Sequence, residues 1–207
     1  MATSALVRLW REARQRPLTF WLASLRSRLR GWVRSDSVIF FRPGPGELDP
    51  SPAVMELDLE MYRRLTPAAM PPWLPEIVSA RFAQGERLFA LYRNDQPVSY
   101  AWVRRARRFQ VGELGGKTAV SDAESVWIWD CVTPPPIRGR GYYPALLDGM
   151  LYLFQHEDVI IFCDVRNHAS VRGIGKSRFT PWIRVTVCPW VTWIRKLGGG
   201  SARLRFE

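Results

Sequence analysis

Several stretches of the chain show the apolar pattern of β-strands. Short runs that are apolar, or that alternate apolar and polar residues between turn residues, predict strands at 37–41, 87–93, 97–104, 124–132 and 159–165. Asn94-Asp95-Gln96 joins two of these strands and indicates a hairpin. Residues 112–121 predict a loop. Residues 179–195, rich in Trp, Val and Ile, predict a strand or a strand pair split by Pro189.

Other stretches predict helices, at 53–65, 76–84 and 142–154. In the first of these, Met55, Leu59 and Tyr62 are expected to point inward. Residues 1–35 predict two further helical pieces broken near Pro17. The second piece carries an apolar stripe with arginines beside it: Leu18, Trp21, Leu22, Leu25, Leu29, Trp32 and Val33.

A strand, a proline hinge and an Arg/Gly loop lead directly into a helix at residues 132–147, V-T-P-P-P-I-R-G-R-G-Y-Y-P-A-L-L. The first N–H groups of a helix lack partners within the helix and lie at the positive end of its dipole, so a helix start can bind phosphate. Gly139 and Gly141 let the backbone approach a ligand, and Arg138 and Arg140 add positive charge. The loop therefore predicts a phosphate site. An ordinary loop before a helix is the alternative, and the missing third glycine disfavours a dinucleotide fingerprint.

This loop resembles that of the GNAT superfamily of CoA-dependent N-acyltransferases, which reads Arg/Gln-x-x-Gly-x-Gly/Ala after a strand and a proline. Arg138-Gly139-Arg140-Gly141 fits the pattern, and Tyr143 departs from it because Gly or Ala is usual there. A second block is also similar to the family: strand 159–165 is followed by Asn167-His168-Ala169-Ser170, then by Lys176 and Phe179. Two blocks in the expected order are more specific than either alone.

The resemblance implies a mixed α/β (α+β) fold. Its central sheet would be mixed but mostly antiparallel, with splayed middle strands and helices on both faces, and the basic N-terminal helices would precede it. Acetyl-CoA would be the co-substrate, and its pantetheine arm would enter between strand 124–132 and the strand ending near Asp164. The implied CoA-binding residues are Cys131 and Val132 through their backbones, together with Arg138, Gly139, Arg140, Gly141, Tyr142, Tyr143, Asn167 and Ser170. Asn167 also suits a helix N-cap, which is its alternative role.

Acyl transfer to an amine requires a base for the ammonium proton and a proton for the leaving thiolate. Period-two alternation places Glu124, Val126, Ile128, Asp130 and Val132 on one face of strand 124–132. Asp130 or Glu124 could act as the base, although either could instead be the structural partner of an arginine. The tyrosine that many family members use as general acid corresponds to Ile174 here. Tyr142 or Tyr143 could take that role, and no metal is expected.

Charge and cysteine content narrow the class of protein. The net charge is +11, and residues 1–34 account for +7 of it. That segment is expected to pack on its own domain or on a second subunit in a homodimer, or to lie on an anionic membrane surface. Nucleic acid is disfavoured because no nucleic-acid-binding motif accompanies the charge. Three widely spaced cysteines argue against a disulfide framework or zinc site and favour a reducing cytoplasm. No signal peptide or membrane span is predicted.

Three segments are expected: a basic amphipathic extension (1–35), a GNAT-like acyltransferase domain (36–197) and a flexible tail (198–207). The predicted function is transfer of an acetyl or other acyl group from acyl-CoA to a small-molecule amine, with an amino sugar of a bacterial cell-surface pathway as one acceptor. The protein would be cytoplasmic, or peripheral at the inner face of the membrane. The alternatives are a catalytically silent CoA-binding regulatory module and a membrane-surface scaffold.

Overall fold

The computed structural model describes residues 35–47, 53–65, 71–188, 191–198 and 204–207. The predicted helices of the N-terminal extension lie outside these residues. Among the helices that are described, none has both the length and the apolar character needed to cross a membrane.

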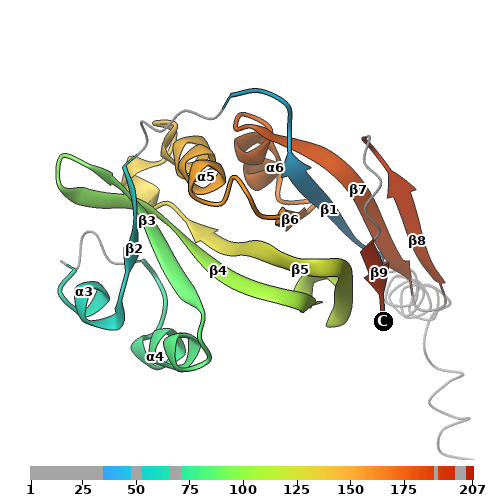
Figure 1. Ribbon diagram of the computed structural model, residues 1–207, viewed down its shortest axis with the longest axis horizontal. Helices are drawn as coiled ribbons and strands as arrows, with labels where there is room; N and C mark the ends of the chain where they lie inside the picture. The colour runs from blue at the N-terminus through green and yellow to red at the C-terminus, as the bar shows by residue number, and fades with distance from the viewer. Residues whose placement is uncertain (1–34, 48–52, 66–70, 189–190, 199–203) are drawn as a thin grey trace, which may run out of the picture.

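A single curved sheet forms the centre of the described structure (Figure 1). Its strands run in the order β2-β3-β4-β5-β6-β1-β7-β8, and β9 pairs with β5. Only the β5–β6 pair is parallel among the described pairs. The bounds are β1 Asp36–Pro43, β2 Val54–Leu57, β3 Arg87–Arg93, β4 Gln96–Val111, β5 Lys117–Val132, β6 Val159–Asp164, β7 Phe179–Cys188, β8 Val191–Lys196 and β9 Leu204–Phe206. This is the mixed, mostly antiparallel sheet that the sequence predicts.

Helices cover both faces of the sheet. Those on one face are α5 (Tyr142–Leu153) and α6 (His168–Ile174), and those on the other are α3 (Leu59–Arg63) and α4 (Pro75–Ala83) (Figure 1). Two short 3₁₀ helices, η1 (Gly112–Leu114) and η2 (Pro135–Ile137), lie in the connections.

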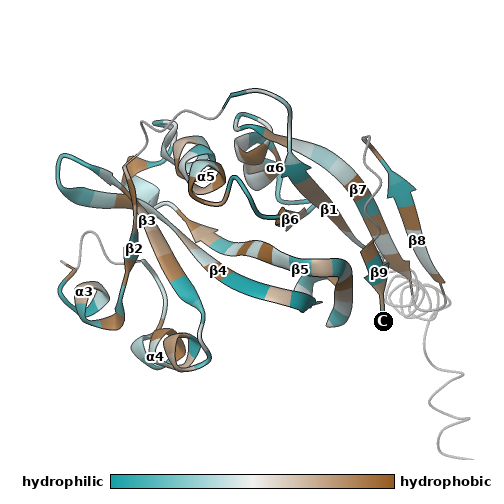
Figure 2. Cartoon of the chain, in the orientation of Figure 1, coloured by the Kyte–Doolittle hydropathy of each residue, from teal (hydrophilic) through white to brown (hydrophobic). Residues whose placement is uncertain are grey.

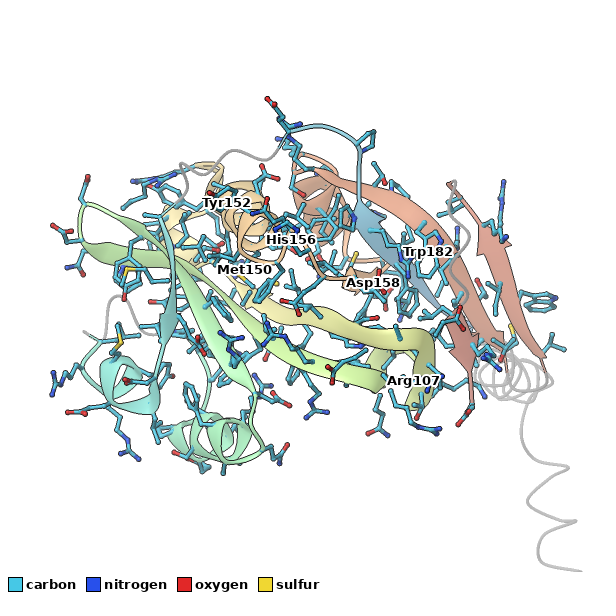
Figure 3. All side chains as sticks on the ribbon, viewed as in Figure 1. Arg107, Met150, Tyr152, His156, Asp158 and Trp182 are labelled. Atoms are coloured by element: carbon cyan, nitrogen blue, oxygen red, sulfur yellow. The ribbon has the colours of Figure 1, made fainter. Side chains whose placement is uncertain are left out.

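Apolar side chains fill the space between these helices and the sheet. Met150 points from α5 towards the sheet and is fully buried, whereas Tyr152 lies on the outer side of the helix (Figure 3). A second core, which includes Tyr62 and Trp102, lies under α3 and α4. In Figure 2 the middle of β1 is apolar, as expected for a strand that has neighbours on both sides. Each face of the sheet therefore has its own core.

The prediction of one helix over 53–65 is wrong. Residues 54–57 form β2, which pairs with the edge of β3, and the helix begins only at Leu59. Asp58 caps that helix by accepting a hydrogen bond from the amide of Met61 at 2.7 Å. Tyr62 is buried as predicted, but Met55 is 49% exposed. Pairing with a strand distant in sequence outweighs the local apolar spacing, which local pattern cannot reveal.

Two other boundaries differ from the prediction. The expected loop at 112–121 is shorter, because β5 already begins at Lys117 and pairs with the long β4. The expected flexible tail contains β9, in which Leu204 is buried and the ring of Phe206 lies 5.5 Å from that of Phe40. Burial of these two apolar residues accounts for the ordered strand.

Candidate functional site

The two middle strands of the sheet separate where the site begins. β5 and β6 pair only through Val126–Ile128 and Val159–Ile161. Beyond these residues β5 stays with β4 as far as Val132, whereas β6 stays with β1 as far as Asp164. The strands therefore splay from Ile128 onward, as the sequence resemblance implies.

A β-bulge lies on β5 at the same point. Tyr100 pairs with Val132 but Trp102 pairs with Trp129, so β5 has one residue more than β4 between these pairs. Asp130 has a φ of 44° there, an unusual conformation for a residue other than glycine. Strained backbone of this kind is often found at functional sites.

The bulge corrects the predicted alternation of side chains. Alternation alone places Asp130 on the same face as Val126 and Ile128, but its carboxylate pairs with Arg81 of α4 at 2.6 Å. Cys131, expected on the opposite face, instead packs with the core beneath α5. The extra residue shifts the period-two pattern by one position, which reverses the faces beyond it. Neighbouring residues of β5 thus point to opposite sides of the sheet.

The predicted phosphate loop leads into α5 through two residues with left-handed backbone. Gly139 has a φ of 79° and Gly141, the N-cap of α5, a φ of 77°, which glycine adopts without steric cost. No side chain among the described residues caps the helix, and Pro144 in its first turn has no N–H. The free amides at the start of α5 are therefore available to a ligand.

A pocket of about 500 Å³ opens beside this loop. It is lined by the end of β5, the phosphate loop, the start of α5 and one side of α6. The predicted residues that line it are Cys131, Val132, Arg138, Gly139, Gly141, Tyr142, Tyr143, Asn167 and Ser170. The structure thus gathers predicted residues separated by up to 39 positions in sequence, from Cys131 to Ser170, around one pocket.

Three predicted residues do not line the pocket. Arg140 is exposed in the loop between the two glycines. Asp130 points to the other face of the sheet, as described above. Glu124 is exposed near the middle of β5, six residues and about 20 Å along the strand from Asp130. That separation argues against Glu124 as a base for chemistry at the pocket.

Several residues that line the pocket are not predicted as site residues from the sequence: Thr133, Ile137, Pro144, Ala169, Arg172, Gly173 and Lys176. Spacing along α6 could have identified some of these residues. Residues three and four apart lie on one side of a helix, and Ala169, Ser170 and Gly173 fit that spacing.

The described residues that line the pocket include cations but no carboxylate. Arg138, Arg172 and Lys176 line it, and among the described residues none of the three forms an ion pair. Arg138 donates from Nε to the carbonyl of Thr133 at 2.8 Å, which fixes its side chain at the rim. Unpaired cations beside a free helix start favour an anionic ligand.

Asn167 caps α6. Its side chain accepts a hydrogen bond from the amide of Ser170 at 3.1 Å, which is the capping role that the sequence left open. Because Asn167 also lines the pocket, capping and ligand contact are compatible.

Tyr143 of α5 lines the pocket and packs against α6. A Cβ atom added to Gly173 would be 2.4 Å from Cδ1 of the tyrosine, and burial raises the pKa of the Tyr143 hydroxyl well above its usual value. Burial also raises the pKa of the Cys131 thiol to about 12. A thiol with that pKa carries almost no thiolate at neutral pH, so Cys131 is a poor nucleophile.

The face of the sheet opposite the pocket holds an aromatic cluster around Arg81. The Arg81 guanidinium lies 4.3 Å from the ring centre of Trp129, 5.1 Å from that of Trp102 and 5.7 Å from that of Trp73. Cation–π contacts and the ion pair with Asp130 therefore hold it in place. The indole N–H groups of Trp102 and Trp129 are buried without a hydrogen-bond partner among the described residues. Buried polar atoms of this kind usually meet water or a ligand.

Glu86 lies beside this cluster, and its carboxyl group should make the stability of the fold depend on pH. It is buried at the start of β3, and one carboxylate oxygen accepts from Arg104 while the other has no partner among the described residues. Burial raises its pKa above the ordinary 4.5, against the opposing effect of Arg104. The folded state therefore holds this proton more tightly than the unfolded state, and stability is lost as pH rises from 4.5 through the folded pKa.

Replacing Glu86 with glutamine is expected to remove this loss. The stability of Glu86→Gln relative to the wild type should increase as pH rises above about 4.5, because only the wild type has to ionise a buried carboxyl. Thermal unfolding between pH 4 and 8 measures the difference, with the exposed Glu113→Gln as control. If the stability advantage of Glu86→Gln over the wild type shrinks as pH rises, the ion pair with Arg104 lowers the pKa of Glu86 more than burial raises it.

Similarity to known proteins is found among solved structures. No family model and no curated protein sequence matches the chain. An acetyltransferase from the GNAT family of Colwellia psychrerythraea has a TM-score of 0.50 at 15% identity, over 74% of this chain and 56% of that one. A GNAT-family protein from Novosphingobium aromaticivorans has a TM-score of 0.49 at 16% identity, over 80% and 66%. A GCN5-related N-acetyltransferase-like protein from Streptococcus suis has a TM-score of 0.44 at 14% identity, over 79% and 65%.

These similarities concern the fold. The likeness to the Colwellia psychrerythraea structure shows that the described residues have a GNAT-like fold, as the sequence motifs imply. The chain spans less than two thirds of the length of each of the three proteins. Among the described residues no group of three or more His, Cys, Asp or Glu side chains is placed to hold a metal ion.

Proposed function

We propose that the chain transfers an acyl group from acyl-CoA to the amine of a small molecule. The observation that carries this proposal is the pocket beside the splay of β5 and β6. There the start of α5 has no side-chain cap, and Arg138, Arg172 and Lys176 have no ion-pair partner, among the described residues. The diphosphate of CoA suits the free amides and Arg138. Its pantetheine arm suits the opening between the strands, where the backbone of β5 beyond Ile128 no longer pairs with β6.

The bulge on β5 suits a reaction between ligands on the two faces of the sheet. Cys131 lines the pocket on one face, and the adjacent Asp130 carboxylate lies on the other face beside Arg81 and the tryptophans. An amine approaching from the tryptophan face would meet Asp130 first. Asp130 would then take the ammonium proton, directly or through water, before the amine attacks the thioester carbonyl.

We infer the class of acceptor from the side chains on the tryptophan face of the sheet. Aromatic rings with buried indole N–H donors suit a molecule that offers a flat apolar surface and hydrogen-bond acceptors, as sugars do. We therefore propose an amino sugar, such as one from a bacterial cell-surface pathway, as the acceptor to test first. Polyamines and amino acids are the comparison classes.

Free-thiol release from acetyl-CoA over a panel of amino sugars, polyamines and amino acids tests this function. The expected result is thiol release that depends on one class of acceptor. Binding of CoA without thiol release for any acceptor would instead favour a catalytically silent CoA-binding module. Absence of CoA binding would overturn the proposal.

Reversing the charge of Arg138 tests the phosphate site directly. Arg138→Glu is expected to weaken CoA binding about tenfold or more, because it replaces a charge-assisted contact with repulsion of the diphosphate. Isothermal titration with CoA measures this. Arg63→Glu is the matched control, since it makes the same change in net charge on α3, at the other face of the sheet. Equal affinities for the two variants would contradict the assigned site.

A further inference from the structure

The outer strand β8 carries exposed apolar side chains that take no part in the proposed reaction. It lies at the edge of the sheet and pairs only with β7 among the described strands (Figure 1). Trp193 is 56% exposed, Ile194 49% and Val191 45%, and Leu197, just after the strand, is 41% exposed. Large apolar side chains that gather at one place, rather than lying singly, mark an interaction surface.

Two arginines lie beside Trp193 on one face of the β7–β8 pair. Arg184 of β7 is directly opposite Arg195 of β8, and Thr186 is directly opposite Trp193. Residues opposite each other in an antiparallel pair share a face, and like charges in that position destabilise the sheet. Both arginines are exposed, and neither forms an ion pair with another described residue. An anionic partner would remove this repulsion.

The basic N-terminal extension joins the sheet near the same edge. β1 begins at Asp36, which is opposite Val187 of β7, and Val187 is in turn opposite Thr192 of β8. The chain before β1, residues 1–34, carries a net charge of +7 and the apolar stripe predicted from the sequence. It is therefore attached two strands from Trp193, at a part of the sheet that is itself basic and apolar.

Charge decides which partner suits this face. Residues 1–34 and a second copy of the chain are both basic, so either would bring further cations towards Arg184 and Arg195. The adjacent cations Arg195 and Lys196 also disfavour pairing of the open edge of β8 with another strand. An anionic lipid surface instead offers phosphates to the arginines and an interfacial layer in which Trp193 is favourable.

We propose that the β7–β8 face, formed by Arg184, Val191, Trp193 and Arg195, docks on an anionic membrane surface. Val191 and Trp193 would enter the interfacial layer, while the two arginines would contact lipid phosphates. Residues 1–34 would add charge to the same contact. This docking does not depend on the proposed reaction.

Sedimentation of the full chain with vesicles tests this assignment. The wild type should bind vesicles of equal parts phosphatidylglycerol and phosphatidylcholine, and should bind phosphatidylcholine vesicles only weakly. Arg184→Gln combined with Arg195→Gln should lower the partition coefficient about thirtyfold, because each basic residue at an anionic surface contributes roughly fivefold. The matched control is Arg63→Gln with Arg64→Gln, which removes the same charge at the other end of the sheet and should change the coefficient less than about threefold.

Trp193→Ala tests the apolar part of the contact. It should lower the partition coefficient about tenfold, and it should leave the unfolding midpoint nearly unchanged because the side chain is exposed. Failure of the wild type to bind anionic vesicles would overturn the proposal. Equal partitioning by the wild type and the double variant of Arg184 and Arg195 would also overturn it, and would assign any vesicle binding to another part of the chain. A dimer in solution that Trp193→Ala dissociates, without vesicle binding, would assign the face to a second copy.

Discussion

Replacing Trp102 with alanine is expected to lower the free energy of unfolding by about 3 to 5 kcal/mol, the usual cost of removing a buried tryptophan. Trp102 lies on β4 and is fully buried. Its ring centre is 5.2 Å from that of Phe82 on α4 and 5.6 Å from that of Trp73. The Arg81 guanidinium also lies over it, at 5.1 Å. The substitution would therefore loosen α4 from the sheet as well as leaving a cavity.

Chemical denaturation measures this loss through the transition midpoint and slope. Trp193→Ala is the matched control, because Trp193 on the edge strand β8 is 56% exposed and its removal should change stability by less than about 0.5 kcal/mol. Similar losses for the two variants would show that the core beneath α3 and α4 is not packed as described.

The phosphate loop could be predicted from the sequence because its structure depends on neighbouring residues. Proline, glycine and arginine define a turn and a helix start within a few positions, and the structure places Gly139 and Gly141 in left-handed backbone as that turn requires. The central strands could be predicted for a similar reason, since alternation and apolar runs are local signals.

The faces of β5 could not be predicted, because a bulge leaves no clear mark in the pattern. The strand reads as regular alternation from Glu124 to Val132, yet an extra residue opposite β4 turns Asp130 towards Arg81. Arg81 itself stands 49 residues earlier in the chain, so only the fold brings the pair together. The site therefore combines a locally encoded loop with a bulge and an ion pair that depend on tertiary structure.

The pairing of Tyr143 with Gly173 is a second feature that depends on tertiary structure. Tyr143 departs from the Gly or Ala usual at its position in the resembled family, and Gly173 of α6 provides the space for its ring. Neither residue is informative alone. Together they indicate that the larger side chain on α5 is accommodated by the absence of one on α6.

Replacing Gly173 with alanine is expected to lower the free energy of unfolding by about 2 to 3 kcal/mol, because the new methyl group would overlap the ring of Tyr143. In a Tyr143→Ala background the same change should reverse in sign and stabilise by about 0.5 to 1 kcal/mol, since alanine favours a helix interior over glycine. A double-mutant cycle of denaturation midpoints measures the coupling. Additive effects would contradict the contact between the Tyr143 ring of α5 and Gly173 of α6.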